Sequence, residues 1–262
     1  MATTGLRYER LMDGRIWRRY EVSTGETVEV WAPWKFDEDF KCQVASYVVD
    51  TTPAAGSPWM KVDTNTGAAV QVAANAAEQI NGAWELVIGA DNNAALSAMY
   101  FKDLLSVPLT AAASATRGLQ IEFRFKVTSA NLTGITVQLG IMSEHNDAVG
   151  SVAEKAWFYL DESLVLACQT DDASVDSGIV PSSSTLVTAT WYIGRIDLSD
   201  LADVKFYLDG TRLCASTTFD MSSMAASHGC QPVLAVRKAA AGTATATLDV
   251  DYVRAWALRF GE

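Results

Sequence analysis

The chain has 262 residues and a mass of 28.2 kDa, with 49% hydrophobic and 19% charged residues. This composition excludes a disordered chain, and the length suits one large β domain or two small ones. A formal net charge of −11 argues against non-specific binding of nucleic acid. The opening residues lack the apolar segment of a secretory signal, and no apolar run reaches the about 20 residues of a transmembrane helix. We therefore expect a soluble protein made in the cytoplasm.

Charge and aromatic residues set the N-terminal segment apart from the rest. Residues 1–20 hold five arginines against two acidic residues, and an acidic stretch with two tryptophans follows. Flexible tails rarely carry so many tryptophans, so we predict an ordered N-terminal arm over residues 1–39 and one domain over 40–262. The arm either packs on its own domain or reaches a partner. In the second case the partner-binding residues are Arg7, Arg10, Arg15, Trp17, Arg18 and Arg19.

Short runs with two-residue alternation begin near residue 40. In one of them, Ile121 and Phe123 alternate with Glu122 and Arg124, which indicates an antiparallel strand with one buried and one solvated face. Asp209-Gly210 lies between two strand-like runs and predicts a two-residue hairpin turn, because both residues tolerate positive φ. About a dozen such strands predict a β-sandwich or a barrel.

Few segments depart from the strand pattern. Helical patterns are limited to residues 73–80 and 221–227, the second with Asp220 as its N-cap. Residues 170–185 are rich in Ser, Thr and Asp and are predicted to form a long exposed loop.

The sequence offers little for nucleophilic or metal catalysis. His145 and His228 lie in polar segments and are expected to be ordinary loop histidines. The motifs of serine hydrolases, zinc enzymes and nucleotide-binding sites are missing. Oxygen-rich segments at residues 91–93 and 144–147 could each hold Ca²⁺ in a loop, although they lack the spacing of an EF-hand. We therefore expect neither a catalytic residue nor a cofactor or bound metal.

Paired carboxylates hydrolyse glycosides when they lie about 5–5.5 Å apart. Asp249 and Asp251 are two residues apart on one predicted strand, and the alternation places them on a solvated face opposite Leu248, Val250 and Tyr252. We interpret them as strand-surface residues. The many tryptophans and tyrosines fit either core packing or a sugar-binding face.

The four cysteines form no C-x-x-C pair. A chain without an export signal keeps its thiols reduced, so no disulfide is expected. Cys168 and Cys214 lie in strand-like runs and are predicted to be small buried side chains.

Two segments resemble a known fold family. WYIGRIDLSDLADVKFYLDGTRL (191–213) and ATLDVDYVRAWAL (246–258) are similar to the closing strands of concanavalin A-like and laminin-G-like jelly rolls. The resemblance implies an all-β, concanavalin A-like jelly-roll β-sandwich preceded by the N-terminal arm. Glycoside hydrolases of the laminarinase type end in a similar way, but their catalytic strand carries E-x-D-x-x-E, which no segment here matches. On this ground we predict that the chain is not an enzyme.

A narrower resemblance spans about residues 58–258. GIMSEHNDAVGSVAEKAWFYL (140–160) and TTFDMSSM (217–224) are similar to a jelly-roll virion protein of tailed bacteriophages. This resemblance implies a capsid decoration or cement protein on the virion surface, synthesised in the host cytoplasm. Its partners would be the major capsid protein and further copies of itself, as a trimer or dimer, and not nucleic acid or a membrane. The alternatives are a carbohydrate-binding head or tail module that attaches to host glycans, and a divergent glycoside hydrolase.

Overall fold

A computed structural model describes part of the chain at the level of side chains and part as backbone only. Side chains are described for residues 59, 83–90, 95–100, 119–129, 132–143, 151–224, 230–238 and 244–256. The backbone alone is described for the strands at 6–12, 15–21, 27–32, 34–38, 60–64, 70–74 and 107–108 and for the end residues 229 and 257.

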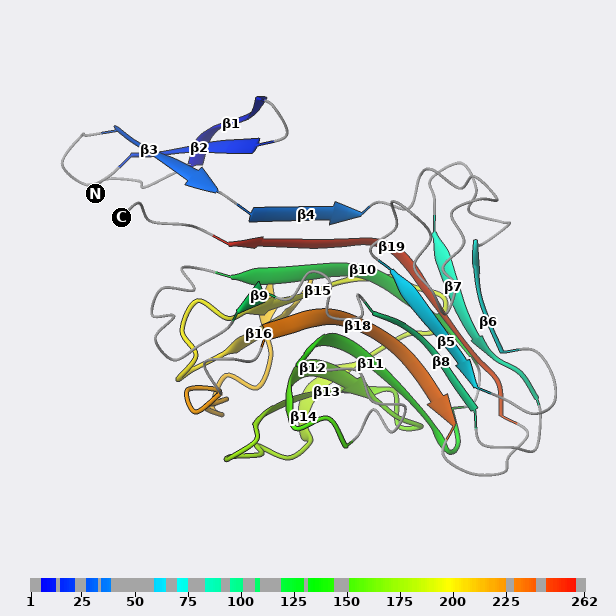
Figure 1. Cartoon of the computed structure of the whole chain (residues 1–262). Coiled ribbons are helices and arrows are strands. Elements are labelled where there is room, and N and C mark those ends of the chain that lie inside the picture. The colour runs from blue at the N-terminus through cyan, green and yellow to red at the C-terminus, as the bar shows by residue number, and fades with distance from the viewer. Residues whose placement is uncertain are drawn as a thin grey trace.

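Two antiparallel sheets of eight strands each form a sandwich (Figure 1). The first sheet has the order β17 (Thr211–Arg212), β16 (Lys205–Leu208), β15 (Trp191–Asp197), β10 (Gln120–Thr128), β19 (Ala246–Ala257), β7 (Trp84–Ile88) and β6 (Val70–Ala74), with β4 (Trp34–Glu38) also pairing with β19. The second has the order β14 (Val180–Thr185), β13 (Val165–Asp172), β12 (Glu154–Leu160), β11 (Ile135–Met142), β18 (Gly229–Lys238), β8 (Ala95–Tyr100) and β5 (Met60–Thr64), with β9 (Val107–Pro108) also pairing with β18. The fold is therefore the predicted jelly-roll β-sandwich.

The alternation of apolar and polar residues in the sequence predicts which side chains form the core. Strand β10 is buried at every second residue, as predicted, and Ile121 and Phe123 are 1% and 0% exposed. The facing strand β11 contributes Val137 and Leu139 to the same hydrophobic cluster. Burial of one apolar face per sheet holds the two layers together.

Three phenylalanines join the layers near one end of the core. Phe206 on β16 packs edge-on against Phe158 on β12 of the other sheet, with ring centroids 5.4 Å apart. Phe219 lies on the other side of Phe206 at 5.0 Å. All three rings are at most 1% exposed. Phe206 is thus in contact with aromatic side chains on two sides.

Local predictions have mixed outcomes. Asp209 and Gly210 have φ angles of 48° and 80°, which confirms the predicted hairpin turn between β16 and β17. The predicted helix at 73–80 is wrong at its start, because residues 73 and 74 belong to β6. Asp220 accepts a hydrogen bond from the Ser222 amide at 2.7 Å, but residues 221–224 form a turn, and residues 225–227 lie outside the described part.

The predicted long loop at 170–185 is also wrong. β13 continues to Asp172 and β14 begins at Val180, so the connection is only residues 173–179. β14 lies at the edge of its sheet and alternates half-buried with exposed residues. Serines and threonines suit such a strand because one of its faces meets water.

The N-terminal arm is built from strands. β1 (Leu6–Met12), β2 (Arg15–Glu21) and β3 (Thr27–Ala32) form a separate three-stranded antiparallel sheet. Residues 34–38 are β4, which pairs with β19 of the first large sheet, so the arm and the sandwich are joined by main-chain hydrogen bonds. No helix of a length and hydropathy suited to crossing a membrane occurs among the residues that the structure describes.

Candidate functional site

The predicted partner-binding residues all lie on β1 and β2. Arg7 and Arg10 belong to β1, and the remaining four belong to β2. In the register of the small sheet, Arg10 is opposite Trp17, and Trp17 is opposite Trp31 of β3. Their side chains lie outside the described part of the structure, so partner binding by this arm stays a prediction.

The outer face of the first sheet carries charges that are already paired. Lys126 forms an ion pair with Asp249 at 3.4 Å, and Arg124 forms one with Asp251. Arg124 and Lys126 also lie 4.7 Å from the centre of the Trp191 ring. Each carboxylate thus has a cation beside it on the outer face, but Asp249 is only 2% exposed, so the predicted solvated position is wrong for Asp249.

One residue on this face was misplaced by the sequence pattern. Tyr252 shares the charged face with Asp249, because its hydroxyl donates to Glu122 at 2.9 Å. The register of β10 and β19 shifts between Arg124 and Phe125, which leaves an extra residue in β19. Such a bulge reverses the alternation beyond it. Burial, with the hydrogen bond to Glu122, raises the pKa of Tyr252 well above that of a free tyrosine.

The outer face of the second sheet differs from that of the first. Leu96, Trp157, Val233 and Ala235 on this face form a second hydrophobic cluster, separate from the core between the sheets. The long strands β11 and β18 are bent, and this face lies on the inside of the bend (Figure 1).

Two carboxylates meet at one edge of this face. Asp171, near the end of β13, forms an antiparallel bridge with Asp176 in the following turn. Directly opposed residues have Cβ atoms about 4.5–5.5 Å apart and lie on the same face of the sheet. Asp176 is exposed, whereas the Asp171 side chain is 15% exposed. The loop predicted over residues 170–185 does not bring these two residues together, so the pair is absent from the sequence predictions.

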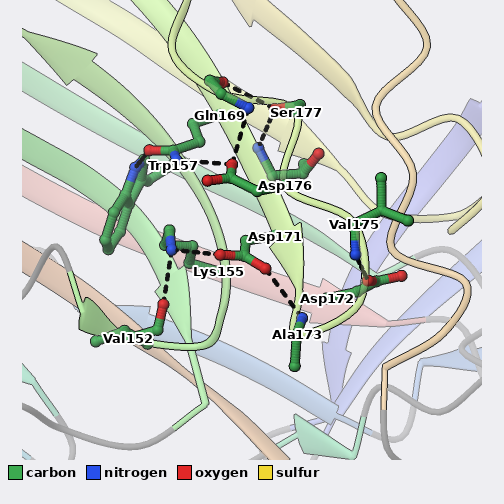
Figure 2. A network of polar contacts seen from close by, with 12 residues as sticks. Val152, Lys155, Trp157, Gln169, Asp171, Asp172, Ala173, Val175, Asp176 and Ser177 are labelled. Atoms are coloured by element: carbon green, nitrogen blue, oxygen red, sulfur yellow. Dashed lines mark hydrogen bonds and ion pairs between the residues drawn. The ribbon is translucent and has the colours of Figure 1, made fainter.

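Each carboxylate has its own donors (Figure 2). Lys155 Nζ forms an ion pair with Asp171 at 2.7 Å and also donates to the Val152 carbonyl at 2.7 Å. Trp157 Nε1 donates to Gln169 Oε1 at 3.0 Å, and Gln169 Nε2 donates to Asp176 Oδ1 at 2.9 Å. The network fixes both carboxylates on the sheet.

The same contacts set the charge of Asp176. Burial alone raises the pKa of Asp176, but hydrogen bonds from Gln169 and the Gly178 amide, together with the charge of Lys155, lower it overall. Asp176 is therefore ionised at neutral pH. An ionised carboxylate only accepts hydrogen bonds, so this group is suited to holding hydroxyl or amide donors.

This pKa predicts a pH dependence of stability. A carboxylate with a lowered folded-state pKa stabilises the fold above its unfolded-state pKa, and the contribution is lost as the pH falls through the folded-state pKa. We expect the melting temperature of the protein to decrease once the pH drops below about 4. The decrease should be smaller in Asp176→Asn, because the asparagine cannot titrate. Thermal melts from neutral to acidic pH would test this, with Asp203→Asn, in the turn before β16 of the other sheet, as the control. Identical acid slopes in the wild type and Asp176→Asn would contradict it.

Two further polar groups line the centre of the same face. Tyr159 is half-buried, and its pKa is raised by burial and by Asp161, against the effect of Arg237. Gln138 lies opposite Tyr159 on β11, is 3% exposed, and has an Oε1 atom with no hydrogen-bond partner among the described residues. A buried acceptor without a donor is costly, so this atom is a place where a ligand hydroxyl would be stabilised.

Several sequence predictions cannot be compared with the structure. His145, His228 and the segments 91–93 and 144–147 lie outside the described residues. Within the described residues no group of three or more His, Cys, Asp or Glu side chains is arranged to hold a metal ion.

Comparison with known proteins gives the fold a context. No protein-family profile matches the chain, and no curated protein sequence matches it. The fold is similar to an endo-acting O-glycanase of the human gut microbiota, named for initiating mucin breakdown, with a TM-score of 0.57, 12% identity and coverage of 86% of this chain and 99% of that one. A lichenase, a β-1,3-1,4-glucanase from a mouse hindgut metagenome, has a TM-score of 0.54 and 14% identity, over 85% and 98% of the two chains. The carbohydrate recognition domain of Emp47p has a TM-score of 0.51 and 10% identity, over 80% and 92%.

These similarities overturn the prediction that the chain is not an enzyme. That prediction depended on the missing E-x-D-x-x-E strand, yet the chain has the fold of a lichenase and an O-glycanase along most of its length. A motif within one strand says nothing about carboxylates that come together across a turn, as Asp171 and Asp176 do. At 10–14% identity the likeness extends to the fold, a concanavalin A-like jelly roll.

Proposed function

We propose that the chain recognises a carbohydrate through the outer face of its second sheet, around Asp171 and Asp176. The observation that carries this proposal is the cross-strand carboxylate pair with its fixed donors, Lys155 and Gln169. Sugar hydroxyls both donate and accept hydrogen bonds, so they match a rigid set of carboxylate, amide and ammonium groups.

Neighbouring side chains support the same ligand class. Tyr159 offers a half-buried aromatic ring, and the Oε1 atom of Gln138 beside it accepts from no described donor. Binding sites for small ligands combine apolar side chains with a few convergent polar groups, and here the half-buried Tyr159 packs against the buried cluster that includes Trp157. The names of proteins with the same fold, an O-glycanase, a glucanase and a carbohydrate recognition domain, favour a glycan over other polar ligands.

This proposal corresponds to the alternative function predicted from the sequence. The capsid-decoration role, the major capsid protein as partner, self-association as a trimer or dimer and a place on the virion surface stay predictions. No comparison described above supports the capsid role.

A glycan array followed by titration calorimetry tests the proposal. We expect the wild-type protein to bind at least one glycan among β-glucans, mucin O-glycans and bacterial surface polysaccharides. Asp171→Asn and Asp176→Asn should each weaken that binding by about 10- to 100-fold, because a hydrogen bond to a charged group contributes about 1.5–3 kcal/mol. The same glycans should be assayed for release of reducing ends, since the fold is shared with hydrolases.

Asp203→Asn is the matched control. Asp203 is a half-buried carboxylate that pairs with Arg212 at 3.4 Å near the opposite sheet, away from the proposed face. Its replacement should leave glycan binding unchanged. Equal loss in the control and in Asp176→Asn, or no glycan bound by the wild type, would overturn the proposal.

A further inference from the structure

Two cysteines lie beside the same residue, Val180, at the edge of the core. Cys168 lies on β13 in the second sheet, opposite Val180 of β14. Cys214 follows β17 of the first sheet, and its Sγ donates to the Val180 carbonyl at 3.5 Å. Val180 pairs with one cysteine and accepts from the other, and both cysteines pack in the same hydrophobic cluster. Residues 46 positions apart in the sequence are thus brought together by the packing of the two sheets.

The backbone around Cys214 is held in place. Cys214 has a φ of 47°, in the left-handed region that side chains other than glycine rarely adopt. The Thr217 amide donates to the Cys214 carbonyl at 2.9 Å, and the Leu213 amide donates to the Phe206 carbonyl at 2.8 Å. These bonds on either side of Cys214 hold its backbone in place, with the sulfur against Val180, the residue paired with Cys168.

We propose that Cys168 and Cys214 form a disulfide that links the two sheets when the protein meets an oxidising small-molecule disulfide. Both residues are free thiols in the structure. The disulfide is therefore a later modification of two cysteines that the fold already holds near each other. The proposal is independent of glycan recognition. It also changes the expectation drawn from the sequence, in which these cysteines were only small buried side chains.

The two sulfurs have different roles in the exchange reaction. Cys214 is half-buried, and the hydrogen bond with Cys168 lowers the pKa of its thiol against the effect of burial. The same hydrogen bond, and then burial, raise the pKa of Cys168, which is 0% exposed. Cys214 is the thiol that attacks first as the thiolate, because it is half-buried and an oxidant can reach it, whereas Cys168 is 0% exposed.

The reaction balances with oxidised glutathione as the oxidant. The Cys214 thiolate attacks one glutathione sulfur, and the first glutathione thiolate leaves. Cys168 then loses its proton and attacks the Cys214 sulfur of the mixed disulfide, which releases the second glutathione thiolate. Two protein thiols are oxidised to one disulfide, and one glutathione disulfide is reduced to two thiols.

Mass spectrometry of the intact protein tests the proposal. After incubation with oxidised glutathione we expect a mass loss equal to two hydrogen atoms and a cross-linked peptide pair containing Cys168 and Cys214. Digestion must include cleavage at Asp220, because Cys214 and Cys230 otherwise share one tryptic peptide. The oxidised protein should melt roughly 5–10 °C higher than the reduced protein, because the link closes a long loop in the unfolded chain.

Single variants separate this pair from the other cysteines. Cys168→Ala and Cys214→Ala should each abolish both the cross-link and the thermal shift, whereas Cys230→Ala should keep both. If Cys230→Ala does not fold, Cys42→Ala serves as the control in its place. A stable glutathione adduct at Cys214 without the cross-link, or a cross-link to a different cysteine, would overturn the proposal.

Discussion

Replacing Phe206 by alanine is expected to lower the free energy of unfolding by about 3–5 kcal/mol. The ring is 0% exposed and contacts Phe158 and Phe219 edge-on, so its removal leaves a cavity between the two sheets. Edge-on aromatic pairs add about 0.5–1.5 kcal/mol beyond the burial of area. Because Phe158 belongs to the second sheet, the loss weakens the contact between layers.

Urea denaturation followed by circular dichroism measures this effect, and the next residue in the chain gives the control. Tyr207 points to the outer face, where its ring stacks on Arg195 at 4.4 Å. Tyr207→Ala should therefore cost about 1 kcal/mol or less. Similar losses for both variants would mean that the three-ring contact does not join the sheets.

Much of the fold follows from short-range patterns in the sequence. The alternation in β10 and the Asp209-Gly210 turn depend only on neighbouring residues, and both are confirmed. The same rule fails at Tyr252, because a bulge in β19 depends on the partner strand and leaves no mark on the composition. It also fails at residues 180–185, where a serine-rich edge strand has the composition of a loop.

The candidate site was hidden for a similar reason. Asp171 and Asp176 are five positions apart, a spacing that by itself predicts no contact. They meet because the chain reverses after Asp172, whose carboxylate accepts from the amides of Ser174 and Val175. A run of Asp and Ser in T-D-D-A-S-V-D-S is typical of such a turn, and that signal could have placed the reversal. The partners Lys155 and Gln169 come from strand pairing, which the sequence alone does not define.

Replacing Gly140 by alanine is expected to destabilise the protein by about 3 kcal/mol. Gly140 is opposite Trp157 in the pairing of β11 with β12. A Cβ atom at this position would lie 2.2 Å from the Ala156 carbonyl oxygen and 2.5 Å from the Trp157 Cα. Both are backbone atoms, so the clash is relieved only if the two strands separate. The gain of about 0.5–1 kcal/mol from removing glycine flexibility in a strand is too small to offset this.

Gly194→Ala is the matched control for the same denaturation experiment. Its Cβ would meet the rims of the Phe158 and Phe125 rings at 2.9 and 3.2 Å, and a ring can tilt where a backbone cannot. We expect a smaller loss, about 1 kcal/mol. Because Trp157 holds Gln169, and Gln169 holds Asp176, the Gly140 variant should also lose glycan affinity while the Gly194 variant keeps it. If a folded Gly140→Ala protein kept its glycan affinity, the hydrogen bonds that run from Trp157 through Gln169 to Asp176 would not be needed for binding. The carboxylate pair would then bind the glycan without their support.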